Sequence, residues 1–336
     1  MFYTPQNREQ EINLKALIYI KSDLYPEGEF LSDSEARLSV WDVGFTNGYT
    51  VYDWTRTFKG KPWQLKEHLR RLYRGCKYAR LDLQMSKEEL ERICIELCSR
   101  NEHLLRLEEG EEFHIPIDTS WGEWDWGHGR PLPVPEGKGK PTVIIRNSLI
   151  DIKLYARFWA TGLHVVTPSH RQVPPMCRDP KLKTYSRMSQ TFPTHEARLV
   201  DPEAMALMLD IWGNIAETTV AAIFLVYDGV LMTPTTNNTL ESVSRANVMK
   251  LAGQLGIEVV ERDLQPWHLV NADEAFICQT APLCITPISR YNGHHVGKTV
   301  PGPITERLAE AWGNWVDYDV TGVSFLSAEE RAKLGL

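Results

Sequence analysis

Two lysines lie two residues apart in the stretch DPKLKTYSRMSQ, residues 179–190. Lys181 and Lys183 follow an Asp-Pro turn and precede a stretch with helical spacing. A lysine amine becomes a nucleophile and a proton carrier when a dry environment or a nearby cation lowers its pKa. Most lysines are instead solvent-facing charges. The residue types alone therefore leave open whether either lysine does chemistry, and which one.

The composition limits the classes of protein to which such a lysine could belong. The chain has 336 residues, 43% of them hydrophobic, which suffices for one large domain or two of ordinary size. Its net charge is -7 and it has no Lys/Arg block, so neither nucleic-acid nor membrane binding is predicted. The charged N-terminus is atypical of a signal peptide, and no apolar run approaches the roughly 18 residues of a membrane helix. We expect a cytoplasmic protein.

The six cysteines do not indicate a disulfide framework in a chain this long, so we expect reduced, mostly buried thiols. Cys94 and Cys98 have the spacing of one helical turn. No cluster of histidine and acidic residues lies near them in the sequence, and no metal site is predicted.

Periodicity predicts a first domain over residues 1–148, in which 1–35 form an N-terminal extension with one strand. Residues 36–45 alternate as a strand would, and Ser86 with Glu89 forms a capping box for a helix. The remaining predicted elements are two strands around a Lys-Gly turn in 49–63, helices in 65–81 and 86–101, and strands in 111–121 and 141–147.

An interdomain loop is predicted at 149–158, followed by a second domain at 159–336. Its expected elements are a strand at 162–168, hairpins at 204–217 and 221–234, a helix at 242–256, a strand at 257–264, a short helix at 266–274 and a single strand at 275–288. This order is not a regular βαβ alternation. Neither GxGxxG nor GxxxxGKS occurs, which argues against a Rossmann or P-loop enzyme.

Several short motifs occur in a characteristic order between about residues 36 and 318. They read SVWDVGFTNGYTVYD, HLRRL, a lysine followed by HEA, LDIWGNIAE, IFLVYDGVLMTP, LESVSR and QTAPLCITPI. The ordered set resembles the fold-type IV enzymes that use pyridoxal 5'-phosphate (PLP). This class contains branched-chain, D-amino-acid and (R)-selective amine transaminases, and aminodeoxychorismate lyase. The resemblance implies an α/β (α+β) fold with a small N-terminal α/β domain and a larger, barrel-like α/β domain that binds PLP. It also implies a homodimer with a shared active site.

The resemblance selects between the two lysines. In relatives the lysine that forms a Schiff base with PLP precedes the glutamate of the HEA motif by about thirteen residues. Lys183 lies thirteen residues before Glu196, whereas Lys181 lies fifteen before it. Lys183 is therefore the predicted catalytic lysine, and Lys181 is expected to face solvent.

Further cofactor contacts follow from the same resemblance. Arg71 of HLRRL corresponds to an arginine that binds the phosphate, while its neighbour Arg70 is expected to face solvent. Glu217 corresponds to the carboxylate that pairs with the pyridine nitrogen, although a surface glutamate is the alternative. Three more phosphate contacts are implied at Val243, Ser244 and Thr280, the first two through backbone N–H groups at a helix start. For Thr280 an ordinary strand residue is the alternative.

The chain departs from its relatives beside two of these positions. Thr218 and Thr219 follow Glu217 where relatives commonly have a glycine and small residues, so one of their hydroxyls is expected to face the cofactor. Glu241 and Ser242 replace the usual Pro-Gly before the phosphate-binding helix. An acidic side chain beside a phosphate dianion is unfavourable unless it points away.

The substrate contacts implied by the resemblance are Tyr52, Asp53, Ala281 and Arg187. Arg187 stands four residues after Lys183, where some relatives place an aromatic. Three roles are open for it: a charge-assisted bond to the cofactor phenolate, recognition of a substrate carboxylate, or a surface salt bridge. The loop with Trp121, Trp124, Trp126, His128 and Arg130 would line the pocket mouth or form a structural aromatic cluster.

The predicted function is PLP-dependent transamination from an amine or amino acid to a 2-oxo acid. The thirteen-residue spacing leans toward an (R)-amine or D-amino-acid donor. A branched-chain L-amino-acid aminotransferase, a lyase of the aminodeoxychorismate type and a non-catalytic relative are the alternatives.

Overall fold

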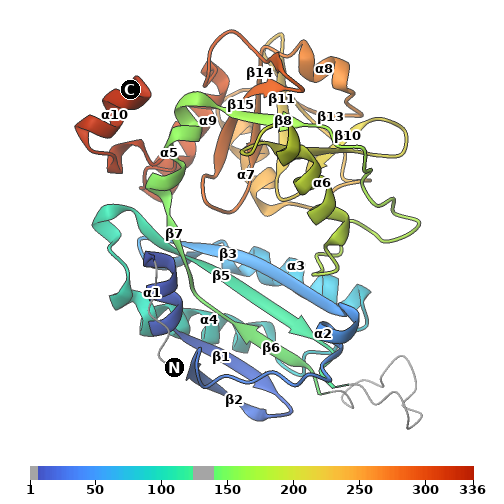
Figure 1. Ribbon diagram of the computed structural model, residues 1–336, viewed down its shortest axis with the longest axis vertical. Coiled ribbons are helices and arrows are strands. Elements are labelled where there is room, and N and C mark those ends of the chain that lie inside the picture. Colours follow the sequence, from blue (N-terminus) through green and yellow to red (C-terminus); the bar gives the residue numbers. More distant parts are fainter. Residues whose placement is uncertain (1–6, 124–139) are drawn as a thin grey trace. The chain divides into compact units, whose positions relative to one another are not determined.

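The structure is a computed structural model that describes residues 7–123 and 140–336, and it divides into two compact units (Figure 1). The first unit contains the chain up to Ile150 together with Leu182–Ser186. The second contains Asp151–Lys181 and Arg187–Leu336. The segment around Lys183 thus belongs to the first unit, although the chain on both sides of it belongs to the second.

The first unit is built on a seven-stranded sheet in the order β2-β1-β6-β5-β3-β4, with β7 paired to β5. Its strands are β1 (Leu17–Ser22), β2 (Tyr25–Ser32), β3 (Thr50–Phe58), β4 (Lys61–Trp63), β5 (Glu111–Ser120), β6 (Thr142–Ile145) and β7 (Ser148–Asp151). Its helices are α1 (Arg8–Lys15), α2 (Val43–Asn47), α3 (Leu65–Tyr78) and α4 (Lys87–Asn101), with 3-10 turns at Glu102–Leu104 and Leu107–Glu109.

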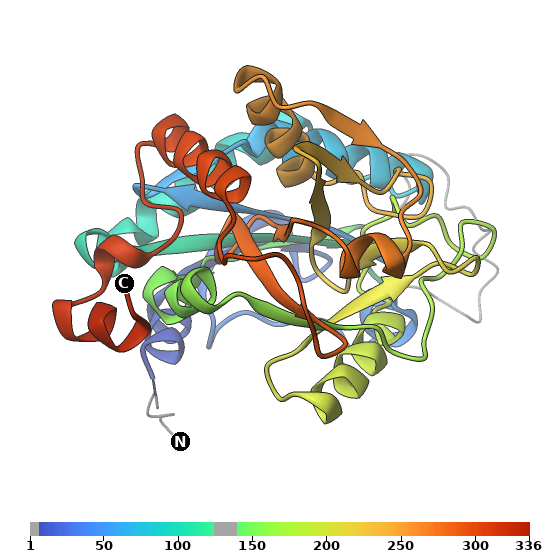
Figure 2. The same cartoon turned by 90° about the horizontal axis from the view of Figure 1, so that it is seen from above.

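Helices α3 and α4 cover one face of this sheet (Figures 1 and 2). Helix α4 buries Leu90, Ile93, Cys94, Leu97 and Cys98, which recur at helical spacing along one side. The side chains of β5 that face these helices, including Phe113, Ile115 and Ile117, are fully buried. The predicted N-cap is confirmed, because Ser86 Oγ accepts a hydrogen bond from the Glu89 N–H at 3.1 Å.

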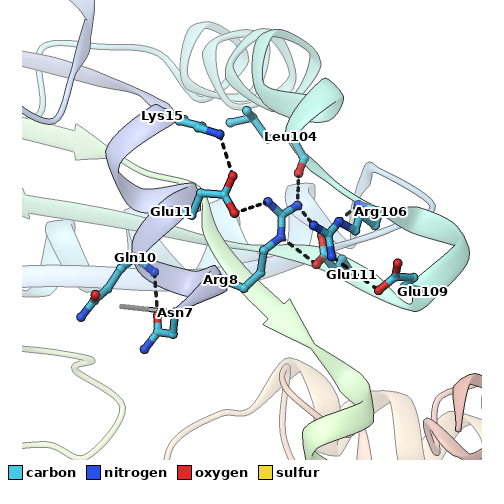
Figure 3. A network of polar contacts seen from close by, with 9 residues as sticks. All are labelled: Asn7, Arg8, Gln10, Glu11, Lys15, Leu104, Arg106, Glu109 and Glu111. Atoms are coloured by element: carbon cyan, nitrogen blue, oxygen red, sulfur yellow. Dashed lines mark hydrogen bonds and ion pairs between the residues drawn. The ribbon is translucent and has the colours of Figure 1, made fainter. Parts of the chain in front are cut away.

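The N-terminal stretch contains more structure than the one strand predicted for residues 1–35. Helix α1 is attached to the sheet by Arg8, whose Nε and Nη2 donate to the two carboxylate oxygens of Glu111 at 2.9 Å (Figure 3). Arg8 Nη2 also donates to the Leu104 carbonyl at 2.6 Å. Strands β1 and β2 then pair with each other, and β1 pairs with β6. Because Glu111 and Leu104 lie about a hundred positions from Arg8, local periodicity does not indicate these contacts.

The strand predicted for residues 36–45 is wrong, since this stretch contains a turn and the short helix α2. Asp42 begins the helix, because its carboxylate accepts a hydrogen bond from the Gly44 N–H at 2.7 Å. Gly48 ends it in the left-handed conformation, with φ at 67°. The local cap therefore outweighs the alternating pattern.

The second unit contains a nine-stranded mixed sheet in the order β10-β9-β8-β15-β14-β11-β12-β13, with β16 paired to β15. Its strands are β8 (Leu163–Val166), β9 (Met205–Leu209), β10 (Ile215–Thr218), β11 (Ala222–Tyr227), β12 (Val230–Thr233), β13 (Val259–Glu261), β14 (Glu274–Cys278), β15 (Ile285–Tyr291) and β16 (His294–His295). Its helices are α5 (Ala156–Thr161), α6 (Met188–Val200), α7 (Val243–Gln254), α8 (Pro266–Val270), α9 (Pro303–Val316) and α10 (Ala328–Leu334), with 3-10 turns at Ile152–Tyr155 and Val323–Phe325.

Both predicted hairpins of this unit are confirmed, as β9 with β10 and β11 with β12. The single strand predicted at 275–288 is wrong. It is two antiparallel strands, β14 and β15, joined by a turn that contains Thr280, Ala281 and Pro282. Proline has no N–H to donate to a sheet, so an uninterrupted strand through Pro282 is disfavoured.

Candidate active site

Lys183 lies in the segment Leu182–Ser186, which is hydrogen-bonded to β3 in the first unit. The Tyr52 N–H donates to the Lys183 carbonyl at 3.0 Å, and Lys183 Nζ lies 4.6 Å from the centroid of the Tyr52 ring. Within the part of the chain that the structure describes, no carboxylate forms an ion pair with this amine. The side chain is half-buried against an aromatic face, which holds the amine in place without a counter-charge.

Lys181 has a different environment, in the second unit. Its Nζ lies 3.5 Å from Asp179 Oδ1, and its side chain is 35% exposed. This ion pair holds the amine against a carboxylate. The two lysines, alike in the sequence, are thus distinguished by their contacts.

Arg71 is held by a buried carboxylate on the helix-covered face of the first sheet. Its Nε donates to Asp53 Oδ2 at 2.8 Å and its Nη2 to Asp53 Oδ1 at 2.7 Å. His68 Nδ1 lies 2.7 Å from the same Oδ1, and Asp53 is fully buried. Burial alone would raise the pKa of Asp53, but Arg71 and His68 outweigh it and hold that pKa well below its usual value. Asp53 is therefore a charged anchor for Arg71, whereas the neighbouring Arg70 has a side chain that is 69% exposed.

The opposite face of the same strands carries a cluster that the sequence analysis missed. Tyr185, two residues after Lys183, stacks on Tyr52 with ring centroids 4.0 Å apart and planes 10° apart. Its hydroxyl accepts from Trp54 Nε1 at 2.9 Å and donates to Asp118 Oδ1 at 2.6 Å. Part of this cluster could be inferred from the sequence, because Tyr52 and Trp54 are two residues apart on a predicted strand and so share one face. The pairing of Tyr52 with Asp118 on β5 is visible only in the structure.

Burial and neighbouring charges both act on the groups around this aromatic cluster. Arg146 Nη2 donates to Asp118 Oδ2 at 2.5 Å, so both oxygens of that carboxylate are engaged. Burial, followed by the charge of Asp118, raises the pKa of Tyr185, which stays a phenol. Burial, followed by the nearby cations of Arg56 and Lys183, lowers the pKa of His114 to about 3. His114 is neutral at pH 7 and packs edge-on against Trp54.

Glu217 lies in the second unit at the end of β10 and is partly buried. Gln172 Nε2 donates to its Oε1 at 3.0 Å, and the Leu240 N–H lies 3.3 Å from each of its oxygens. These donors are neutral, so they orient the carboxylate without themselves cancelling its charge. This environment differs from the surface position that was the alternative.

The altered loop after Glu217 is stabilised by its own threonines. Thr218 Oγ1 accepts from the Ala221 N–H at 2.8 Å, and Thr219 Oγ1 lies 3.2 Å from Thr194 Oγ1. Both threonines are buried. Arg187, at the start of α6, donates from Nη2 to the Thr219 carbonyl. This bond joins the residue before α6 to the loop that follows Glu217.

Val243 and Ser244 are the first two residues of α7, in which Ser242 serves as the N-cap. Ser242 Oγ accepts from the Arg245 N–H at 3.2 Å, which leaves the first two helical N–H groups directed out of the helix end. Ser244 is buried. Thr280 and Ala281 lie in the turn between β14 and β15 and are half-buried.

Comparison with known proteins identifies the family of this chain. The profile of the family described as "Amino-transferase class IV" matches residues 50–291. A Methanocaldococcus jannaschii protein assigned as a branched-chain-amino-acid aminotransferase is 31% identical over 288 residues, which are 85% of this chain and 94% of that protein.

The chain is a class IV aminotransferase.

Other members of the family are similar at lower identity. A D-alanine aminotransferase of Staphylococcus aureus is 26% identical over 88% of this aminotransferase and 98% of that protein. Among solved structures, a T.th. branched-chain amino acid aminotransferase complexed with N-(5'-phosphopyridoxyl)-L-glutamate is similar, with a TM-score of 0.76 and 26% identity. That match covers 94% of this aminotransferase and 97% of that chain. The mixed α/β architecture is accordingly that of a fold-type IV enzyme.

The cofactor of class IV aminotransferases is PLP. The residues of this aminotransferase fit it chemically. Lys183 offers an amine that is not ion-paired within the described residues, Glu217 a carboxylate bonded to neutral donors, and α7 a helix start of the kind that binds phosphate.

Three remaining expectations concern other parts of the aminotransferase. Within residues 7–123 and 140–336, no group of three or more potential metal ligands is found, and no helix is long and apolar enough to cross a membrane. Trp121 packs against Tyr49 with ring centroids 5.5 Å apart. Its predicted companions lie outside the described residues: Trp124, Trp126, His128 and Arg130.

Proposed function

We propose that this aminotransferase uses Lys183 as its catalytic lysine in transamination between an amino acid and a 2-oxo acid. The observation that carries the proposal is the environment of its amine, which rests on the Tyr52 ring and has no ion pair among the described residues. Lys181, by contrast, forms an ion pair with Asp179.

The other residues have supporting roles in this proposal. When bound, PLP supplies an electron sink for the electron pair left at substrate Cα. Lys183 Nζ attaches the cofactor to the protein, and once freed it removes the proton from substrate Cα. Glu217 pairs with the protonated ring nitrogen. The phosphate is bound by groups that neutralise or hydrogen-bond it: Arg71, the N–H groups of Val243 and Ser244, and Thr280.

Two residues predicted to touch substrate have contacts that suggest other roles. Asp53 accepts hydrogen bonds from both Arg71 and His68, so we propose that it orients Arg71. Arg187 bonds to the Thr219 carbonyl, so we propose that it positions the loop that follows Glu217. Tyr52 and Ala281 remain the proposed substrate contacts.

The assignment of Lys183 is tested by replacing each lysine in turn. PLP is added to the wild type, Lys183→Ala and Lys181→Ala, each sample is reduced with borohydride, and the modified peptide is identified by mass spectrometry. We expect the wild type and Lys181→Ala to carry the cofactor covalently on Lys183, and Lys183→Ala to carry none and to lack activity. Retention of activity by Lys183→Ala would contradict the proposal.

For the amino donor, we propose branched-chain L-amino acids first and D-amino acids second. The first choice rests on the M. jannaschii relative at 31% identity, and the second on the S. aureus D-alanine aminotransferases at 26%. A panel of L-leucine, D-alanine and an (R)-amine, each with 2-oxoglutarate or pyruvate, tests this order. Turnover of D-alanine or the (R)-amine alone would restore the preference predicted from the spacing. Product formed without any 2-oxo acid, in amounts well beyond one equivalent per PLP, would indicate a lyase.

We also propose that the enzyme is a homodimer whose partner contributes to the active site. An exposed apolar patch around α2 supports this, with Trp41 68% and Phe45 73% exposed, and with Leu38, Val40 and Tyr49 beside them. Sedimentation of the wild type and of Trp41→Ser/Phe45→Ser tests it. We expect a dimer for the wild type and a monomer with reduced activity for the variant.

A further inference from the structure

The segment from Lys183 to Ser186 is attached to β3 and to the turn before it. The Tyr52 N–H donates to the Lys183 carbonyl at 3.0 Å, and the Tyr185 N–H donates to Thr50 Oγ1 at 2.9 Å. Ser186 Oγ donates to the Gly48 carbonyl at 3.1 Å. These bonds hold the segment, but they do not restrain the long lysine side chain.

The Tyr185 side chain makes the strongest connection between this segment and the sheet. Its hydroxyl is held from two directions, by the Trp54 indole at 2.9 Å and by Asp118 at 2.6 Å. Asp118 is fixed in turn by Arg146 at 2.5 Å. A phenol that bonds to a carboxylate makes a charge-assisted hydrogen bond, which is stronger than a neutral one.

Tyr185 and Lys183 also share an aromatic neighbour. The Tyr185 ring stacks on Tyr52 at 4.0 Å, and Lys183 Nζ lies 4.6 Å from the centroid of that same Tyr52 ring. Tyr52 is itself almost fully buried, at 2% exposure. The position of the Tyr52 ring, and with it the surface on which the amine rests, therefore depends on where the Tyr185 phenol is held.

We infer that Tyr185 is a positioning residue for Lys183, with Asp118 and Arg146 as its anchor and Trp54 as its second support. Tyr185 acts by fixing the Tyr52 ring and the lysine segment, and it does not itself contact the reacting atoms. This inference rests on the proposed catalytic role of Lys183. It assigns a function to four residues that the sequence analysis did not single out.

The test compares Tyr185→Phe with Tyr73→Phe. Tyr73 belongs to the same unit, and its hydroxyl donates to the Met85 carbonyl at 2.7 Å, so both variants lose a phenol hydrogen bond while keeping the ring. Three quantities are measured for each: the unfolding temperature, the rate of covalent attachment of PLP without any donor, and kcat and KM. Attachment is followed by borohydride quenching and mass spectrometry at Lys183.

We expect Tyr185→Phe to slow both attachment and kcat by on the order of tenfold or more, because small misplacements of a reacting group are costly. KM for the donor should stay within about twofold. Tyr73→Phe should lower the unfolding temperature while leaving both rates unchanged. Equal rates in the two variants would overturn the inference and leave Tyr185 a structural residue.

Two further variants keep the result decisive. Asp118→Asn should reproduce the slow attachment of Tyr185→Phe. If Tyr185→Phe does not fold, Trp54→Phe, which removes the indole donor and one of its two fused rings, decides the question by the same comparison with Tyr73→Phe. Failure of the proposed function has a separate signature, namely covalent attachment of PLP that persists in Lys183→Ala.

Discussion

The ion pair between Asp53 and Arg71 permits a quantitative prediction. Asp53 is fully buried, the Arg71 side chain is 11% exposed, and two N–H···O bonds of 2.8 and 2.7 Å join them. In Asp53→Asn the amide oxygen can replace Oδ1 and keep the hydrogen bond from Arg71 Nη2. The amide NH₂ then replaces Oδ2, so the bond from Arg71 Nε is lost because both groups are donors. Removing one partner of a buried pair costs about 3–5 kcal/mol, against about 0–1 kcal/mol for an exposed pair. Because Arg71 keeps some access to solvent, we expect a loss of about 3 kcal/mol, near the lower limit.

The assay is a double-mutant cycle on thermal unfolding. A loss of about 3 kcal/mol corresponds to a fall of roughly 6–12 °C in the unfolding temperature of a unit of this size. Asp53→Asn with Arg71→Gln should cost less than the sum of the two single variants, by about 1.5–3 kcal/mol, because the second change removes the uncompensated charge.

The control is Asp42→Asn. Asp42 is also buried, but it accepts from Ser120 Oγ and Thr142 Oγ1, both at 2.6 Å, rather than from a cation. Its replacement should show no coupling to Arg71→Gln. The reasoning is refuted if Asp53→Asn costs less than about 1 kcal/mol, or if its effect simply adds to that of Arg71→Gln.

Three further predictions concern the first unit and the thiols. The pKa of His114 falls from 6.5 in the unfolded chain to about 3 in the folded one, so its contribution to stability is present above pH 6.5 and lost as the pH falls toward 3. At a pH of about 4.5 the unfolding free energy should be lower by roughly 2 kcal/mol than at pH 7, and His114→Asn should remove that part of the decrease. A thiol reagent should label one cysteine rapidly in the native protein, Cys177, and all six after unfolding; fast labelling of a second would contradict the burial of the other five. Gly48→Ala should cost about 1–2 kcal/mol in denaturant titrations, because φ is 67° there and a Cβ would lie 2.6 Å from Ser186 Oγ; an unchanged midpoint would exclude this strain.

Much of the fold follows from local patterns that the sequence displays directly. Helix α4 was predicted because its apolar residues recur at helical spacing behind Ser86, and the β11–β12 hairpin because Asp228-Gly229 suits a tight turn. The predictions were wrong where a cap or a proline competed with an alternating or apolar pattern. The cap at Asp42 outweighed the alternation of residues 36–45, and Pro282 divided a stretch that looked like one strand.

The sequence by itself determined the class of enzyme through the order of its motifs, and it predicted Lys183 as the catalytic lysine through the distance from Glu196. Those are properties of order and spacing along the chain. Only the tertiary structure decided the environment of each side chain, because it joins positions that are far apart in sequence. The structure places Lys183 beside Tyr52, which is about 130 residues away in the sequence. It also joins Asp53 to Arg71 and Tyr185 to Asp118 by hydrogen bonds. Whether an amine is unpaired, a carboxylate neutralised or a phenol fixed depends on such contacts and on burial, which no local motif encodes.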